Sequence, residues 1–146
     1  MPSVYPLVLV PASFQGHFPN MAKRDEVVWR RFLAAHAQSY LAFAYDVALG
    51  GVVHSLPDAD PADVKAWQYK TALKLDVVAI GEREAWIIEV KPDAHVSAIG
   101  ACVVYTLVAE REQVFDRPLR AAVVCEYAQP DVQWAAERLG ISVIVV

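Results

Sequence analysis

Three charged residues interrupt two apolar segments near the middle of the chain. Asp76 lies within LKLDVVAI (73–80), and Glu89 and Lys91 lie near the end of EAWIIEVK (84–91). An unpaired charge is costly to bury, so these groups either lie at strand ends or share a partner. Two carboxylates that approach each other need a proton or a cation between them. Carboxylate oxygens suit Mg²⁺ or Mn²⁺, and a lysine beside such an ion can orient a water or neutralise a phosphate.

The predicted local structure brings these three residues together. Both segments are rich in β-branched residues and are joined by GERE, which predicts an antiparallel hairpin turning near Gly81. Side chains alternate along a strand, so Glu89 and Lys91 point to the same side. Asp76 then lies opposite the region of Glu89, where the carbonyl of Val90 offers a further oxygen ligand. The hairpin therefore predicts a candidate metal site.

Periodicity and capping residues predict the remaining elements. In chain order these are a helix over about 22–39, a strand over 40–51, a loop over 54–67 and, after the hairpin, a helix over 95–113, a strand over 119–127, a helix over 130–140 and a strand over 141–146. Asn20 is suited to cap the first helix. Pro61 is suited to begin a helical turn within the loop.

This order predicts one α/β domain over 21–146, with a mixed central sheet flanked by helices. The hairpin is antiparallel, and the strand–helix–strand units after it predict parallel neighbours. Residues 1–20 carry prolines at positions 2, 6, 11 and 19 and predict an extended N-terminal arm. Such an arm packs either on a neighbouring subunit or on its own domain, and the sequence leaves both arrangements open.

Asp76 followed by Glu89-Val90-Lys91 resembles the motif of the PD-(D/E)XK nuclease superfamily, which includes restriction endonucleases, Holliday-junction resolvases and phage exonucleases. The α-β-β-β-α-β order of that family also matches residues 22 to about 126. The resemblance implies a restriction-endonuclease-like fold and a catalytic set of Asp76, Glu89 and Lys91. It implies that Asp76, Glu89 and Val90 bind Mg²⁺ or Mn²⁺, that Glu26 of the first helix adds a ligand, and that Tyr105 faces the site.

The chain departs from the family pattern in two respects. Leu75 stands where the family name has a proline. The net charge is −4 and the 13 basic residues are scattered, whereas a nucleic-acid-binding surface is usually basic. DNA contacts would therefore be local or assisted by metal ions or another subunit. Lys74 and His95 are accessory candidates for contacting a phosphate, because both are close to the site in sequence.

Two functions compete on these observations. The first is Mg²⁺-dependent hydrolysis of DNA phosphodiester bonds by Asp76, Glu89 and Lys91. The second is a catalytically silent nuclease-fold module, for example a phage virion or head–tail connector component. Such a module would use its arm and apolar faces to bind other protein subunits, in a homo-oligomer or a larger complex. The intact charged set favours the enzyme, and the 56% hydrophobic composition favours the module.

Simpler interpretations of the same residues also stand. Asp76, Glu89 and Lys91 can form a cross-strand salt bridge, and Glu26 can be a solvated acid that favours the helix dipole. Cys102 and Cys125 lie in apolar runs, as buried free thiols do. No apolar run reaches the roughly 18 residues that a membrane span needs. We expect a cytoplasmic protein, or a virion protein if a phage encodes it.

Overall fold

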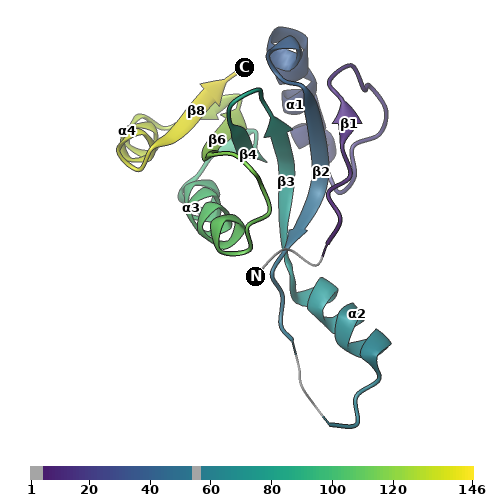
Figure 1. Cartoon of the computed structure of the whole chain (residues 1–146). Coiled ribbons are helices and arrows are strands. Elements are labelled where there is room, and N and C mark those ends of the chain that lie inside the picture. The colour runs from purple at the N-terminus through teal and green to yellow at the C-terminus, as the bar shows by residue number, and fades with distance from the viewer. Residues whose placement is uncertain (1–4, 54–56) are drawn as a thin grey trace.

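The computed structural model describes residues 5–53 and 57–146. Six strands form the main sheet, in the spatial order β1-β2-β3-β4-β6-β8, and β5 and β7 form a separate two-stranded sheet (Figure 1). The elements in chain order are β1 (Val10–Pro11), α1 (Lys23–His36), a 3-10 turn (Ala37–Ser39), β2 (Ala42–Leu49), α2 (Pro61–Thr71), β3 (Leu73–Ile80), β4 (Ala85–Val90), β5 (Asp93–Ala94), α3 (Val96–Arg111), β6 (Leu119–Cys125), β7 (Tyr127–Ala128), α4 (Pro130–Arg138) and β8 (Ile141–Val145).

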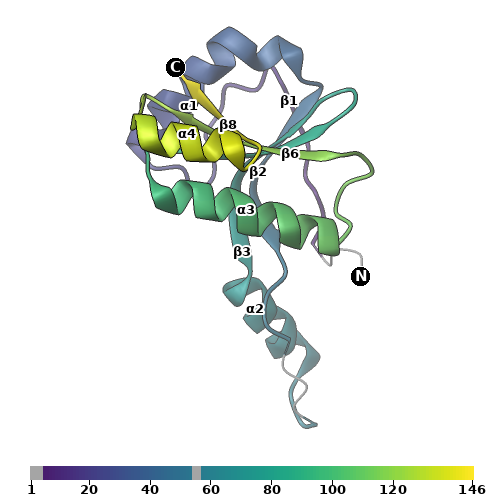
Figure 2. The ribbon, with the colours of Figure 1, turned by 90° about the vertical axis from the view of Figure 1, so that its left-hand side faces the viewer.

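The main sheet is mixed, as the sequence predicts. β1, β2, β3 and β4 pair antiparallel, whereas β4, β6 and β8 pair parallel. Helix α1 covers one face of the sheet, and α3 and α4 cover the other (Figure 2). The predicted fold class, an α-β-β-β-α-β core with a mixed central sheet flanked by helices, is confirmed.

Strand β6 shows why its sequence is an almost unbroken apolar run. Ala122 and Val124 pack in the cluster beneath α1, whereas Ala121, Val123 and Cys125 pack in the cluster with α3 and α4. Parallel strands covered on both faces need apolar side chains at every position. The apolar run is therefore explained by the position of β6 in the sheet, with helices on both faces.

Helix α1 forms where periodicity predicts it, but its start differs. The buried residues Val28, Trp29, Phe32 and Leu33 lie along one stripe of the helix. Asn20 is not the N-cap: Ala22 occupies that position, without a side-chain capping bond. Asn20 instead adopts a positive φ of 55°, and its amide donates a hydrogen bond to Asp46 Oδ2 at 2.7 Å. Asparagine tolerates that backbone conformation better than most residues.

The described part of the N-terminal segment packs on its own domain. Val10 of β1 pairs with Phe43 of β2 at the edge of the sheet. Phe18 is fully buried, in ring contact with Tyr45 at a centroid distance of 4.9 Å and beneath the guanidinium of Arg30. Residues 5–20 therefore complete the core beneath α1 in this structure.

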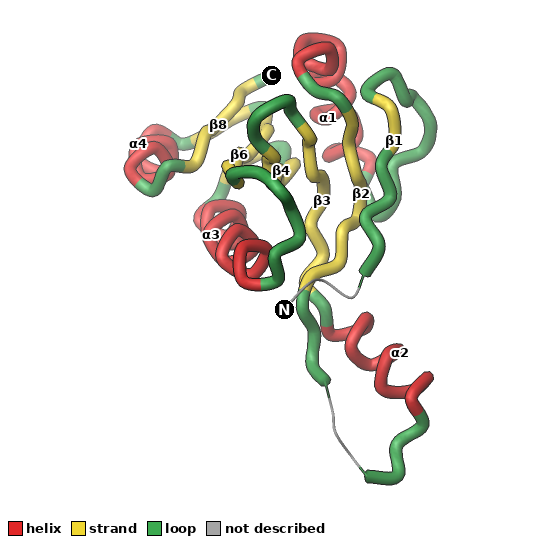
Figure 3. The backbone as a smooth tube through the Cα atoms, in the orientation of Figure 1, coloured by secondary structure: helices red, strands yellow, loops and turns green. Residues whose placement is uncertain are grey.

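The main departure from the predicted elements is α2. The sequence predicts a loop over 54–67 with a helical turn from Pro61, whereas the structure has an eleven-residue helix; residues 54–56 lie outside the described residues. Its start follows from the chain itself, because the Asp60 carboxylate accepts a hydrogen bond from the Ala62 N–H at 2.9 Å and Pro61 opens the first turn. Helix α2 extends away from the body beyond the ends of β2 and β3 (Figures 1 and 3).

Within the described residues, none of the helices has the length and apolar character that crossing a membrane would require.

Phe18→Ala is expected to lower the free energy of unfolding by about 3–5 kcal/mol, because it removes a fully buried ring from the core beneath α1. Val8→Ala is the matched control in the same segment, because Val8 is 72% exposed. Urea unfolding of both variants measures the difference. Equal stabilities for the two variants would show that the segment does not contribute to the core.

Candidate active site

The candidate site forms where β3 and β4 separate. Their ladder runs from Ile80 paired with Ala85 to Val77 paired with Ile88, and the next positions in this register are Asp76 and Glu89. There the Val90 N–H donates to Asp76 Oδ2 at 3.0 Å, so a side chain replaces the backbone partner. The register thus places Asp76 opposite Glu89, as the hairpin predicts.

A third carboxylate approaches from β2. Tyr45 pairs with Val77 and Val47 pairs with Leu75, so Asp46 occupies the position facing Asp76. Asp46 has a positive φ of 51°, a strained backbone conformation for a residue within a strand. The hydrogen bond from Asn20 holds its carboxylate. Sequence reasoning missed Asp46, because a single acid in a β-strand pattern gives no sign of an irregular backbone.

Glu89 is the buried carboxylate of the site. Its side chain is on the face of β4 that α3 covers, and the residue is 5% exposed. Burial raises the pKa of Glu89 to about 7, and the negative charge of Asp76 adds to the rise. The charge of Lys91 and a hydrogen bond from the Asp76 backbone lower the pKa. Glu89 Oε1 is buried and has no hydrogen-bond partner among residues 5–53 and 57–146.

Asp76 lies in the same electrostatic environment. Burial raises its pKa, whereas the Val90 N–H and the Lys91 charge lower it. The negative charges of Asp25 and Asp46 raise it further. Several carboxylates therefore repel one another here, with Lys91 as a nearby positive charge.

Helix α3 lines the site with Cys102 and Tyr105. Burial raises the pKa of Cys102 to about 12, and Glu89 adds to the rise. Its thiol donates a hydrogen bond to the Ala122 carbonyl, with a sulfur–oxygen distance of 3.6 Å. Burial also raises the pKa of Tyr105, and the negative charges of Glu89 and Asp76 raise it further. Both groups are thus neutral at pH 7, and the charges of Glu89 and Asp76 act on each of them.

The acidic residue of α1 that acts on these carboxylates is Asp25. Its charge raises the pKa of both Asp76 and Glu89. Glu26 forms an ion pair with Arg30 at 2.7 Å. The helical stripe holds the signal for this assignment, since Asp25 precedes Val28, Trp29 and Phe32 by three, four and seven residues and so shares their face. Sequence reasoning named Glu26 instead, because it did not compare the positions of the two acids with the buried stripe of the helix.

The two accessory candidates, Lys74 and His95, occupy different places. Lys74 Nζ donates to the Tyr69 carbonyl at 2.8 Å and lies 3.4 Å from the centroid of the Tyr69 ring. This contact directs Lys74 toward α2. His95 is exposed at the N-cap position of α3, where its carbonyl accepts from the Ala98 N–H.

One observation supports the binding of a hard divalent cation by the residues at this site. The buried, unpartnered Oε1 of Glu89 lies beside Asp76, and an unsatisfied buried acceptor is costly. A proton or a cation relieves that cost. Across residues 5–53 and 57–146, no three or more His, Cys, Asp or Glu side chains are gathered closely enough to hold a metal. A cation here would therefore use two carboxylates, with the remaining ligands from the backbone or water.

Comparisons with known proteins give little beyond this geometry. No protein-family model matches the chain, and no curated protein matches it. Among solved structures, the crystal structure of a repair endonuclease from Pyrococcus abyssi aligns with a TM-score of 0.45 and 16% sequence identity. The alignment covers 50% of this chain and 32% of that chain. A likeness of this extent carries no inference about activity.

The pKa of Glu89 predicts a pH-dependent stability. Folding raises the pKa from 4.5 to about 7, so the folded protein binds the proton more tightly than the unfolded chain does. The contribution of Glu89 to the free energy of unfolding is thus complete below pH 4.5 and is lost as the pH rises through 7, by about 3 kcal/mol in total.

Urea unfolding of Glu89→Gln and the wild type, between pH 4.5 and 8 with EDTA present, measures this effect. The variant should gain stability relative to the wild type as the pH rises, because the amide that replaces the carboxyl group does not ionise. Glu137→Gln on the exposed surface of α4 is the control and should show no such trend. A parallel pH dependence of wild type and Glu89→Gln would contradict the assignment.

Proposed function

We propose that this protein is a metal-dependent nuclease that hydrolyses DNA phosphodiester bonds. The observation that carries the proposal is the buried carboxylate of Glu89, with its unpartnered Oε1, beside Asp76. A pair of carboxylates that is partly desolvated and adjacent to a lysine is a frequent arrangement in functional sites. The proposal is further supported by the α-β-β-β-α-β order, which the PD-(D/E)XK resemblance requires.

Asp76, Glu89 and the carbonyl of Val90 would hold Mg²⁺ or Mn²⁺, whose preferred ligands are oxygens. When bound, the ion would supply an activated water and stabilise negative charge on the phosphate. The Val90 N–H fixes the Asp76 carboxylate through its hydrogen bond to Oδ2, so one ligand is oriented by the backbone next to another. This arrangement pre-positions the acidic groups.

Lys91 supplies the positive charge for the reaction. Its charge lowers the pKa of both Asp76 and Glu89, which supports a role for it beside them. Its backbone N–H donates to the Val124 carbonyl at 3.0 Å, so β6 fixes the start of its side chain. We assign Lys91 to hold the attacking water and to neutralise a phosphate oxygen. Asp25, rather than Glu26, is the acidic residue of α1 whose charge acts on the two carboxylates.

Cleavage of DNA with Mn²⁺ tests this assignment. Asp76→Ala and Lys91→Ala should each lower the cleavage rate about 100-fold or more, because each removes a group that contacts the reacting phosphate or its cation. Lys91→Ala should keep its metal binding, which separates the role of the lysine from that of the carboxylates.

Glu26→Gln is the matched control for this experiment. Glu26 lies one residue from Asp25, but is paired with Arg30, so its variant should cleave at the wild-type rate. Asp25→Asn should lower the rate. Equal cleavage by the wild type and Asp76→Ala would exclude a nuclease that uses this site.

The alternative function, a silent module for protein assembly, is supported by exposed apolar residues. Leu107 of α3, Trp134 of α4 and Leu139 after α4 all lie on the surface. Apolar side chains at a surface are common singly but form interfaces when they gather. Under this alternative the protein binds other subunits and fails to bind Mn²⁺, and sedimentation equilibrium together with metal titration distinguishes the two functions.

A further inference from the structure

Helix α2 is held in place without adding to the core. None of its eleven residues is buried, although an isolated helix of this length is marginal in water. Thr71 Oγ1 accepts a hydrogen bond from the Val52 N–H at 2.7 Å and donates to the Trp67 carbonyl at 2.9 Å. Gly51, at a φ of 103°, allows a close approach, because a Cβ there would lie 2.1 Å from the Gln68 carbonyl oxygen. The chain thus fixes the position of a helix that has no fully buried residue.

The surface of α2 combines aromatic rings with lysines. Trp67 is 43% exposed and Tyr69 is 49% exposed, and Lys65 and Lys70 are exposed beside them. Lys70 Nζ lies 5.9 Å from the Trp67 ring centroid. Lys74 of β3 lies over the Tyr69 ring, so each of the two exposed rings of α2 has a lysine beside it.

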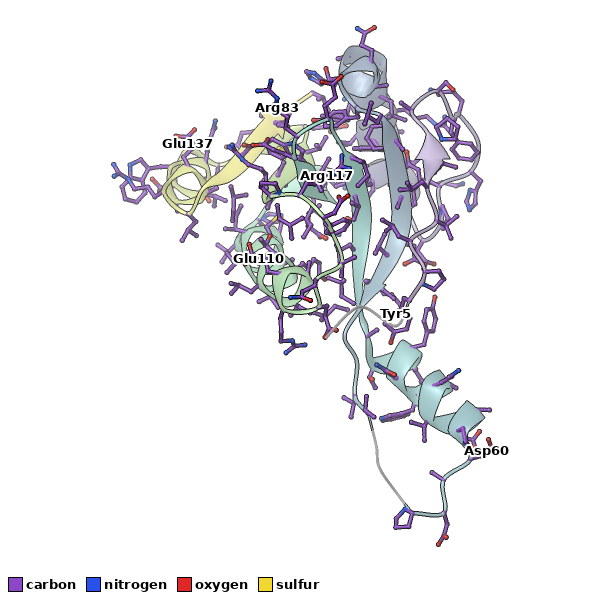
Figure 4. The ribbon with its side chains drawn as sticks, viewed as in Figure 1. Tyr5, Asp60, Arg83, Glu110, Arg117 and Glu137 are labelled. Carbon is purple, nitrogen blue, oxygen red and sulfur yellow. The ribbon has the colours of Figure 1, made fainter. Side chains whose placement is uncertain are left out.

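The charges of this segment are separated along its length. Asp58, Asp60 and Asp63 lie at the start of the helix, where Figure 4 places Asp60 at the end far from the body. Lys65, Lys70 and Lys74 follow toward the body of the protein. The positive end of the protrusion therefore lies on the side of the candidate active site.

A groove lies between the N-terminal segment, β2 and Tyr69 of α2. It has a volume of about 300 Å³, and its lining includes Tyr5, Tyr45, Asp46 and Tyr69. The ring of Tyr5, which Figure 4 labels, contacts that of Tyr69 at a centroid distance of 5.9 Å. Asp46 occupies the position facing Asp76 in the sheet, so the lining of the groove includes both Tyr69 of α2 and a neighbour of the candidate carboxylates.

We propose that α2 and this groove bind a single strand of nucleic acid and direct it to the site; this inference rests on the proposed nuclease function. Trp67 would stack on an unpaired base, and the three lysines would contact phosphates. A single strand fits better than a duplex, because bases expose their faces only when unpaired. A protein partner fits less well, since lysine is depleted at protein interfaces.

Fluorescence anisotropy with a labelled single-stranded DNA, in EDTA to prevent cleavage, tests the proposal. Trp67→Ala should weaken binding about tenfold, because one stacking contact is lost. The double variant Lys65→Ala and Lys70→Ala should also weaken binding and lower the slope of log K against log salt by roughly 1.4. Both variants should fold, since no α2 residue is buried, and thermal melting checks this.

A matched control lies on α4. Trp134 is 60% exposed, and the guanidinium of Arg138 lies 4.6 Å from its ring centroid, so Trp134→Ala removes a similar exposed ring with its cation. This variant should bind the strand as the wild type does. Absence of wild-type binding, or equal weakening by Trp67→Ala and Trp134→Ala, would overturn the proposal. So would a loss of self-association in Trp67→Ala with unchanged DNA binding, which would identify α2 as a protein interface.

The result also separates this inference from the proposed function. If the wild type cleaves DNA with Mn²⁺ but the α2 variants bind the strand normally, the nuclease stands and the role of α2 fails. If the α2 variants lose binding but the wild type does not cleave with Mn²⁺, the binding surface stands and the catalytic assignment fails.

Discussion

The carboxylate of Glu89 is buried beside that of Asp76. Burial and the charge of Asp76 bring the Glu89 pKa to about 7, and Oε1 has no hydrogen-bond partner in the described part of the chain. A fold that only needed stability would place an apolar residue at this position, since β4 is otherwise apolar. The cost is accounted for if the pair binds a cation that is part of the function.

The sheet produces this arrangement through the separation of its strands. The β3–β4 ladder ends at Val77 and Ile88, and beyond it the Asp76 side chain accepts the Val90 N–H. The change extends to β2, where Asp46 has a positive φ beside the same point. On one side of this point along the strands, Phe43 and Val77 pack in the cluster beneath α1. On the other side, Leu49 and Leu75 pack in the cluster that includes Ala109 of α3, although each lies an even number of residues from its counterpart in the same strand. The carboxylates thus gather where the strands change their packing partners.

Much of this arrangement was predictable from sequence, because it depends on local patterns. The β-branched runs predict the hairpin and its approximate register, which places Asp76 opposite Glu89. The unbroken apolar run of β6 predicts a strand covered on both faces. Where periodicity is strong, the sequence defines the elements and the residues that face each other.

The features that the sequence did not predict depend on contacts between distant segments. Asn20 donates a hydrogen bond to Asp46 instead of capping α1, because β2 brings Asp46 within its reach. The length of α2 was underestimated because it has no apolar stripe, although Asp60 and Pro61 mark its start. Asp25 was within reach of prediction, because it shares the buried face of α1 with Val28 and Phe32.

The central claim is that the pair of Asp76 and Glu89 binds a divalent cation. Calorimetric titration of Mn²⁺ into the wild type, Asp76→Ala, Glu89→Gln and the control Glu26→Gln measures it most directly. The account predicts binding by the wild type and Glu26→Gln, and its loss in both variants of the pair. Absence of wild-type binding at millimolar metal, or binding that survives in Asp76→Ala and Glu89→Gln, would contradict it.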